Sequence, residues 1–112
     1  MKRECTTKED VLVLTPREAR IDADLAPEFK AEMLDLVKKG HFNIVVNFSA
    51  VDFIDSSGLG ALVSAFKTIG DRGQIKLCEL GEGLKSIFSL TRLDSIFSIH
   101  QSETEAITSM NS

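Results

Sequence analysis

The stretch Val51-Asp52-Phe53-Ile54-Asp55-Ser56-Ser57-Gly58-Leu59-Gly60 connects an apolar run, Asn43 to Phe48, to a segment with helical spacing. A continuous apolar run is typical of a strand that is covered on both faces of a parallel sheet. After the stretch, four apolar residues recur at helical spacing: Leu59, Leu62, Val63 and Phe66. They predict a helix that begins at about Ser57 and turns these side chains to one face. The stretch is therefore predicted to be the loop of a strand–loop–helix unit.

Upstream of this unit, Val11 to Leu14 is short, β-branched and apolar, and predicts a strand. Arg17 to Ile21 predicts a second strand after the break at Pro16. A helix follows, with Asp24 as its expected N-cap and Gly40 as its stop. Its apolar face comprises Leu25, Phe29, Met33, Leu36 and Val37.

Downstream of the unit, the chain turns at residues 70–73 and then alternates between strands and helices. Further strands are predicted over Gln74 to Cys78 and Ile96 to His100, and further helices over Glu82 to Leu90 and Glu103 to Met110. Alternation of this kind implies right-handed crossovers and a mostly parallel sheet. The predicted class is α/β, with four or five strands.

Length and composition indicate one domain without metal or cofactor. A chain of 112 residues has the usual size of a single domain. We expect residues 1–9, which are polar, to form a flexible N-terminus, and residues 10–112 to form the domain. A net charge of −4 does not favour nucleic acid or anionic lipid as partners. Cys5 and Cys78 form no disulfide or metal pattern, and Cys78 lies in an apolar run that predicts a buried thiol.

No apolar stretch approaches the roughly 20 residues that cross a bilayer, and the charged N-terminal residues do not resemble a signal peptide. We therefore expect a cytoplasmic protein without membrane insertion. His41 and His100 have no neighbouring ligand residues that would predict a metal site.

Ser56 and Ser57 are predicted to lie where a helix begins, at the carboxyl end of a strand. A phosphate on Ser56 would be favoured by the positive end of the helix dipole. It would also add a charge of about −1.5 to −2 beside Asp52 and Asp55. A partner surface matched to a neutral hydroxyl would reject that charge. The alternative is that one of the two serines is simply the N-cap, and the residue types alone leave both interpretations open.

The stretch from Val51 to Gly60 resembles the signature of STAS-domain anti-sigma-factor antagonists. The similarity extends from about Val11 to Ile107, and includes Gly73 to Cys78 followed by Leu84 to Leu93. The resemblance implies a single STAS domain that acts as a bacterial signal-transduction module in transcription regulation.

By position, the resemblance makes Ser56 the phosphorylated residue, with Ser57 as the second choice. It implies that Asp22 contacts a kinase near that serine. One departure stands out, because this chain has Ala19-Arg20 where many relatives have Gly-Glu. The charge is reversed there, and partner identity or affinity is the property that we expect this change to affect.

The resemblance implies a partner-switching cycle. The unphosphorylated domain would bind an anti-sigma factor, a serine kinase with an ATPase fold, and would release it once Ser56 is phosphorylated. A metal-dependent serine phosphatase would restore binding, so the domain is a substrate and a binder but no enzyme. The expected partner-binding residues are Asp22, Asp24, Phe53, Asp55, Ser57, Gly58 and Leu59.

One alternative keeps the family but not the switch, namely a constitutive STAS subunit of a lipid-transporting ATPase or a signalling scaffold. Enzymatic functions agree less well with the sequence. A dinucleotide site needs a small residue where Val63 stands, and no Walker lysine follows the glycines. A serine hydrolase would place its nucleophile in Gly-x-Ser-x-Gly, and Ser56 is flanked by Asp55 and Ser57 instead. Leu14 to Pro16 lacks the acidic pair of a receiver domain.

Overall fold

The computed structural model describes residues 1–111 and contains a five-stranded sheet in the order β1-β2-β4-β6-β7. The strands are β1 (Arg3–Lys8), β2 (Val11–Pro16), β4 (Asn43–Asn47), β6 (Gln74–Cys78) and β7 (Ser98–His100). β2, β4, β6 and β7 are parallel to one another, and β1 pairs antiparallel with β2 at one edge. The α/β class and the mostly parallel sheet are thus confirmed.

Strand β1 corrects the expectation of a flexible segment before residue 10. It pairs with β2 over its whole length, from Arg3 opposite Pro16 to Lys8 opposite Val11. Glu9 and Asp10 form the turn between them, with φ angles of 51° and 66°. Positive φ at both turn residues is the geometry that matches the twist of a hairpin. All six residues of β1 are exposed, so backbone pairing rather than side-chain burial holds the strand.

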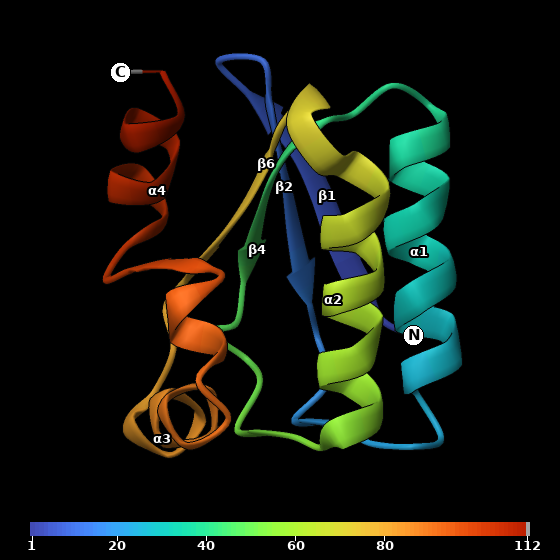
Figure 1. The fold of residues 1–112 in the computed structure, drawn as a ribbon, viewed down its shortest axis with the longest axis vertical. Helices are drawn as coiled ribbons and strands as arrows, with labels where there is room; N and C mark the ends of the chain where they lie inside the picture. The colour runs from blue at the N-terminus through green and yellow to red at the C-terminus, as the bar shows by residue number, and fades with distance from the viewer. Residues whose placement is uncertain (112) are drawn as a thin grey trace.

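Four helices cover the two faces of the sheet unequally. They are α1 (Ala26–Lys38), α2 (Ser56–Ile69), α3 (Glu82–Leu90) and α4 (Glu103–Met110), with short 3-10 turns at Gly70–Arg72 and Leu93–Ser95. Figure 1 shows α1 and α2 side by side on one face of the sheet, with α4 on the opposite side. The predicted bounds of α3 and α4 are confirmed. Helix α1 begins two residues after Asp24, and its N-cap is Leu25, so the predicted capping role of Asp24 is wrong.

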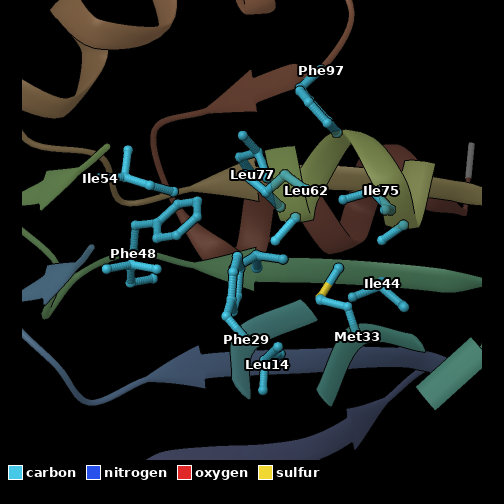
Figure 2. Close-up of a cluster of buried hydrophobic side chains, with 14 of the residues drawn as sticks. Leu14, Phe29, Met33, Ile44, Phe48, Ile54, Leu62, Ile75, Leu77 and Phe97 are labelled. Carbon is cyan, nitrogen blue, oxygen red and sulfur yellow. The ribbon is translucent and has the colours of Figure 1, made fainter. Parts of the chain in front are cut away.

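The main core lies between the sheet and helices α1, α2 and α3. Figure 2 shows Phe29 and Met33 of α1 and Leu62 of α2 in one cluster with the strand residues Ile44 and Leu77. A smaller cluster on the other face contains Val13, Val45 and Cys78 beneath Ala106 and Ile107 of α4. Alternate residues of β4 enter the two clusters, which explains why residues 44–46 are all apolar.

The face of α2 differs from the prediction at one position. Leu59 and Leu62 are buried, but Phe66 is 40% exposed. Its ring meets the buried ring of Phe97 edge-on, with 5.5 Å between centroids. Phe66 therefore lies at the rim of the core rather than inside it. No helix within residues 1–111 has the length and apolar character needed to cross a membrane.

A second, two-stranded sheet positions the loop before α2. It consists of β3 (Arg20–Ile21) and β5 (Phe53–Ile54), which run parallel. The amides of Asp52 and Phe53 donate to the carbonyl of Ala19, at 2.7 and 3.2 Å. Only two residues of the strand predicted over Arg17 to Ile21 are in fact extended and paired. This small sheet brings the segment before α1 against the segment before α2.

Candidate phosphorylation and partner-binding site

Asp55 is the residue that caps helix α2. One carboxylate oxygen, Oδ1, accepts the backbone N–H of Ser57 at 2.9 Å and that of Gly58 at 3.2 Å. Asp55 itself has an extended backbone, with φ of −96° and ψ of −176°, as an N-cap residue should. Its own amide donates to the carbonyl of Ile21 at 3.2 Å, which fixes the cap to strand β3. The hypothesis that Ser56 or Ser57 is the N-cap is therefore wrong.

Ser56 is the first residue of α2 and is exposed. Its hydroxyl makes no hydrogen bond with any of residues 1–111. The carboxylate of Asp55 already occupies the amides that a serine cap would use. Ser56 thus presents an exposed hydroxyl without a hydrogen-bond partner among residues 1–111, at the positive end of a helix.

Gly58 permits the close approach that places this helix end. A β-carbon on Gly58 would lie 2.5 Å from Cγ1 of Ile54 and 3.0 Å from the carbonyl oxygen of Ile21. Both distances are too short, so the first turn of α2 rests on β3 and β5 only because residue 58 has no side chain. Leu59 follows with 7% of its surface exposed. Gly58 and Leu59 are therefore packed beneath the N-terminus of α2 and offer a partner little surface.

Asp22 and Asp24 lie in the connection from β3 to α1. The Asp22 carboxylate accepts the amide of Asp24 at 3.1 Å, and the Asp22 carbonyl accepts the amides of Leu25 and Ala26. Asp22 thus forms the turn that begins α1. Because Ile21 contacts Gly58 and accepts the amide of Asp55, this turn lies beside the N-terminus of α2. The structure therefore brings the sequence-predicted acidic residues to one end of the molecule.

Phe53 is half-buried and is covered by the side chain of Arg20. The guanidinium carbon lies 4.3 Å from the centroid of the Phe53 ring, a cation–π arrangement. The two residues are register partners in the small sheet, where Ile21 and Ile54 are buried. Strand alternation therefore turns Arg20 and Phe53 outward together.

A shallow groove between α1 and α2 adds residues that the sequence alone did not identify. Its lining is Ala23, Ala26, Pro27, Lys30, Ser57, Gly60 and Ala61. Helical spacing contained a signal, because Gly60 and Ala61 lie one turn after Ser57 on the same face of α2. Small side chains there keep the groove open next to Ser57. Among residues 1–111, no group of three or more His, Cys, Asp and Glu side chains is arranged to hold a metal ion.

The chain is similar to known proteins in sequence and in fold. An anti-sigma-B factor antagonist of Listeria monocytogenes is 36% identical over 88 residues, covering 76% of this chain and 75% of the relative. A crystal structure from Thermotoga maritima, of a protein assigned as an anti-sigma factor antagonist, matches with a TM-score of 0.91 at 29% identity. That match covers 98% of this chain and 95% of the other.

The phosphorylated form of the Bacillus cell fate determinant SpoIIAA matches with a TM-score of 0.70, over 96% of this chain and 97% of the other. At 19% identity this likeness concerns the fold alone. The STAS domain family model matches residues 2–106, nearly the whole chain and including strand β1. With that match, and the strand–loop–helix site where the family signature falls, the chain belongs to the STAS domain family.

Proposed function

We propose that this chain is an anti-sigma-factor antagonist whose binding is switched by phosphorylation of Ser56. In the unphosphorylated form it sequesters an anti-sigma factor that has an ATPase fold and serine-kinase activity. The observation that carries the proposal is the exposed Ser56 hydroxyl, which is unbonded because Asp55 caps the helix. A serine engaged as the cap would have to leave its hydrogen bonds before it could be phosphorylated.

The effect of a phosphate follows from the charges around Ser56. The N-terminus of α2 favours an anion, so the fold tolerates the modification. Asp55 lies next in sequence, and Asp22 belongs to the adjoining turn. The phosphate would therefore add charge to a surface that is already acidic. A partner packed over a neutral hydroxyl would have to bury that charge unpaired, and its affinity would fall.

The names of two relatives support the proposed function. The Listeria protein is named an anti-sigma-B factor antagonist, and SpoIIAA has been solved in a phosphorylated form. In the proposed cycle the kinase partner modifies Ser56 and a metal-dependent serine phosphatase reverses the modification. The domain itself performs no turnover. The surface offered to the partner comprises the exposed parts of Asp22, Asp24, Phe53, Asp55 and Ser57.

The experiment compares Ser56→Ala and Ser56→Asp as baits in lysate of the source organism, with mass-spectrometric identification of the captured proteins. The identified ATPase-fold partner is then expressed and titrated by calorimetry. We expect Ser56→Ala to bind and Ser56→Asp to bind at least about tenfold more weakly. Thr104→Asp is the matched control, because it adds the same charge to the exposed first turn of α4.

Phosphorylation is tested directly by incubating the domain with the partner and ATP and mapping the modified peptide. We expect phosphate on Ser56 in the wild type and in Ser57→Ala, and none in Ser56→Ala. Equal affinity of the Ala and Asp variants for a captured partner would overturn the switch. The chain would then be better described as a constitutive binding subunit of a larger assembly.

A further inference from the structure

Arg20 is a positive charge on an acidic rim. Within residues 19–29 and 49–60 it is the only basic residue, and the next one along the chain, Lys30, lines the groove between α1 and α2. Those segments also contain Asp22, Asp24, Asp52 and Asp55. Yet Arg20 forms no ion pair or side-chain hydrogen bond with any of residues 1–111, and its recorded contact is with the Phe53 ring. Its guanidinium is therefore oriented by stacking while its N–H donors remain available.

Stacking fixes Arg20 in a way that suits recognition. The guanidinium carbon lies over the Phe53 ring, 4.3 Å from its centroid, and the N–H donors lie around the edge of the planar guanidinium group. The edge can then receive a carboxylate in the two-pronged geometry that arginine favours. Because the side chain is already held, less rotamer entropy is lost on binding.

Arg20 also lies close enough to Ser56 to share one interface with it. Arg20 is the register partner of Phe53 across neighbouring strands, which lie about 4.8 Å apart. The three residues from Phe53 to Ser56 span at most about 11 Å. An interface that buries about 800 Å² on each partner corresponds to a disc of about 16 Å radius. A partner centred on the Ser56 hydroxyl therefore covers Arg20 as well.

We propose that Arg20, held against Phe53, selects the partner by its charge, and that the partner presents an aspartate or glutamate opposite it. This inference rests on the proposed function, because it concerns the same interface. It places two electrostatic requirements on neighbouring points of the partner's surface. The surface over Ser56 must reject added negative charge, and the surface over Arg20 must supply a negative charge. A partner with a uniformly basic face meets neither requirement, because it would attract a phosphate on Ser56 and repel Arg20.

The test titrates the expressed partner against Arg20→Glu, Arg20→Lys and Phe53→Ala. We expect Arg20→Glu to weaken binding about tenfold or more, since it sets two like charges against each other. Arg20→Lys should cost about threefold, because lysine keeps the charge but loses the planar two-pronged contact. Phe53→Ala should weaken binding by a similar factor, because the ring that holds the Arg20 guanidinium is removed. Lys38→Glu is the matched control, since it makes the same charge change on an exposed residue at the C-terminal end of α1.

A reversal experiment identifies the partner's residue. Each surface carboxylate of the partner is replaced by arginine, and one such variant should restore binding to Arg20→Glu while weakening binding to the wild type. Thermal unfolding of every variant verifies that the fold is retained. If Arg20→Glu binds as the wild type does, or if no partner variant restores it, the inference is overturned.

The same titrations separate this inference from the proposed switch. Loss of binding in Ser56→Asp with full binding in Arg20→Glu would leave the switch standing and remove the charge selection. Loss of binding in Arg20→Glu with full binding in Ser56→Asp would leave the charge selection standing and remove the switch. Failure of all baits to capture an ATPase-fold partner would count against both.

Discussion

Gly58 and Ile21 meet so closely that a single added carbon would collide. A β-carbon on Gly58 would lie 3.0 Å from both Cγ2 and the carbonyl oxygen of Ile21. Gly60, two residues later, would place a β-carbon in open space, with no atom within 4 Å. The two glycines of the same stretch therefore have different roles. Gly58 sets the position of the α2 N-terminus, and Gly60 leaves the groove beside it shallow and open.

Gly58→Ala should destabilise the domain although alanine is the better helix former. The clash with Ile54 and Ile21 costs roughly 1–3 kcal/mol, as for overpacking elsewhere. The higher helix propensity of alanine offsets at most about 1 kcal/mol of this cost. Gly60→Ala is the control, and it should leave the free energy of unfolding unchanged or raise it by up to about 1 kcal/mol. Urea unfolding measures both, and equal stabilities of the two variants would contradict the packing argument.

Asp55→Ala and Ser56→Ala should have unequal effects on stability. Asp55 accepts two amides of the first turn of α2, so its removal should lower the free energy of unfolding by about 1 kcal/mol. Ser56→Ala should change it by less than about 0.5 kcal/mol, since the hydroxyl is exposed and unbonded. Asp55→Asn retains a capping oxygen and should lie between them. A larger loss in Ser56→Ala than in Asp55→Ala would show that the serine caps the helix.

The sequence predicts those elements of the fold whose side chains alternate between core and solvent. Apolar spacing predicts helices α3 and α4 and strand β6 with the bounds that they have, and a glycine or serine just before each element marks its start. Strand β1 has no buried side chain, so no apolar pattern reveals it. Strand β1 is recognised only by its backbone pairing with β2, and that pairing depends on the tertiary fold.

The structure brings the residues proposed for the site to one end of the molecule, but the sequence does not predict the local role of each. Residue types at a helix start do not distinguish an aspartate cap from a serine cap one position later, because both are favoured there. The two-residue strands β3 and β5 are too short to show the alternation of apolar and polar residues that predicts a strand. The stack of Arg20 on Phe53 joins residues that lie far apart in the chain, and only the register of those strands brings them together.

The two cysteines should differ in reactivity. Burial raises the pKa of the Cys78 thiol to about 12, so at pH 8 about one molecule in 10⁴ holds the thiolate. Cys5 is exposed on β1, although partial desolvation and Glu32 raise the pKa of its thiol. Ellman's reagent at pH 8 should therefore modify Cys5 alone in the native protein and both residues in denaturant. Native Cys5→Ser should not react, and prompt labelling of that variant would contradict the burial of Cys78.

Glu103 should make the attachment of α4 sensitive to acid. Its carboxylate accepts a hydrogen bond from Lys8 Nζ at 2.6 Å and another from Asn47 Nδ2 at 2.9 Å. The bond from Lys8 is the main reason that the pKa of Glu103 lies below its ordinary value. A carboxylate whose folded pKa is depressed stabilises the fold above its unfolded pKa, near 4.3, and loses this contribution as the pH falls through the folded pKa.

The variant Glu103→Gln tests this dependence. Urea unfolding at pH 7 should show the wild type more stable by about 1 kcal/mol. That difference should shrink as the pH falls below about 4.3 and vanish once the wild-type carboxyl is protonated. Glu82→Gln is the control, because Glu82 is exposed and its ion pair with Lys85 is at 3.6 Å. A constant difference between the Glu103 variant and the wild type across this range would contradict the role of the charge.

Lys76 and His100 form a pair of interacting bases under α4. Lys76 is only 9% exposed, and its Nζ donates to Ser109 Oγ at 2.7 Å. The same hydroxyl lies 3.4 Å from Nε2 of His100, which also has Ser98 Oγ at 2.9 Å. Burial lowers the pKa of His100, and the positive charge of Lys76 lowers it further, while Glu105 acts in the opposite direction. Protonated His100 is therefore disfavoured in the folded state.

Lys76→Met should raise the pKa of His100, because it removes the nearby positive charge while leaving the burial in place. The ring-proton shift of His100, followed by NMR against pH and identified by loss of the signal in His100→Gln, measures the change. Because the folded pKa of His100 lies below the unfolded one, wild-type stability should decline as the pH falls from about 6.5 through the folded pKa. Lys76→Met should reduce that decline, and adding His100→Gln to it should remove the part of the decline that the burial of His100 still causes. An unshifted His100 titration in Lys76→Met would mean that burial alone sets the pKa and that the two bases do not interact.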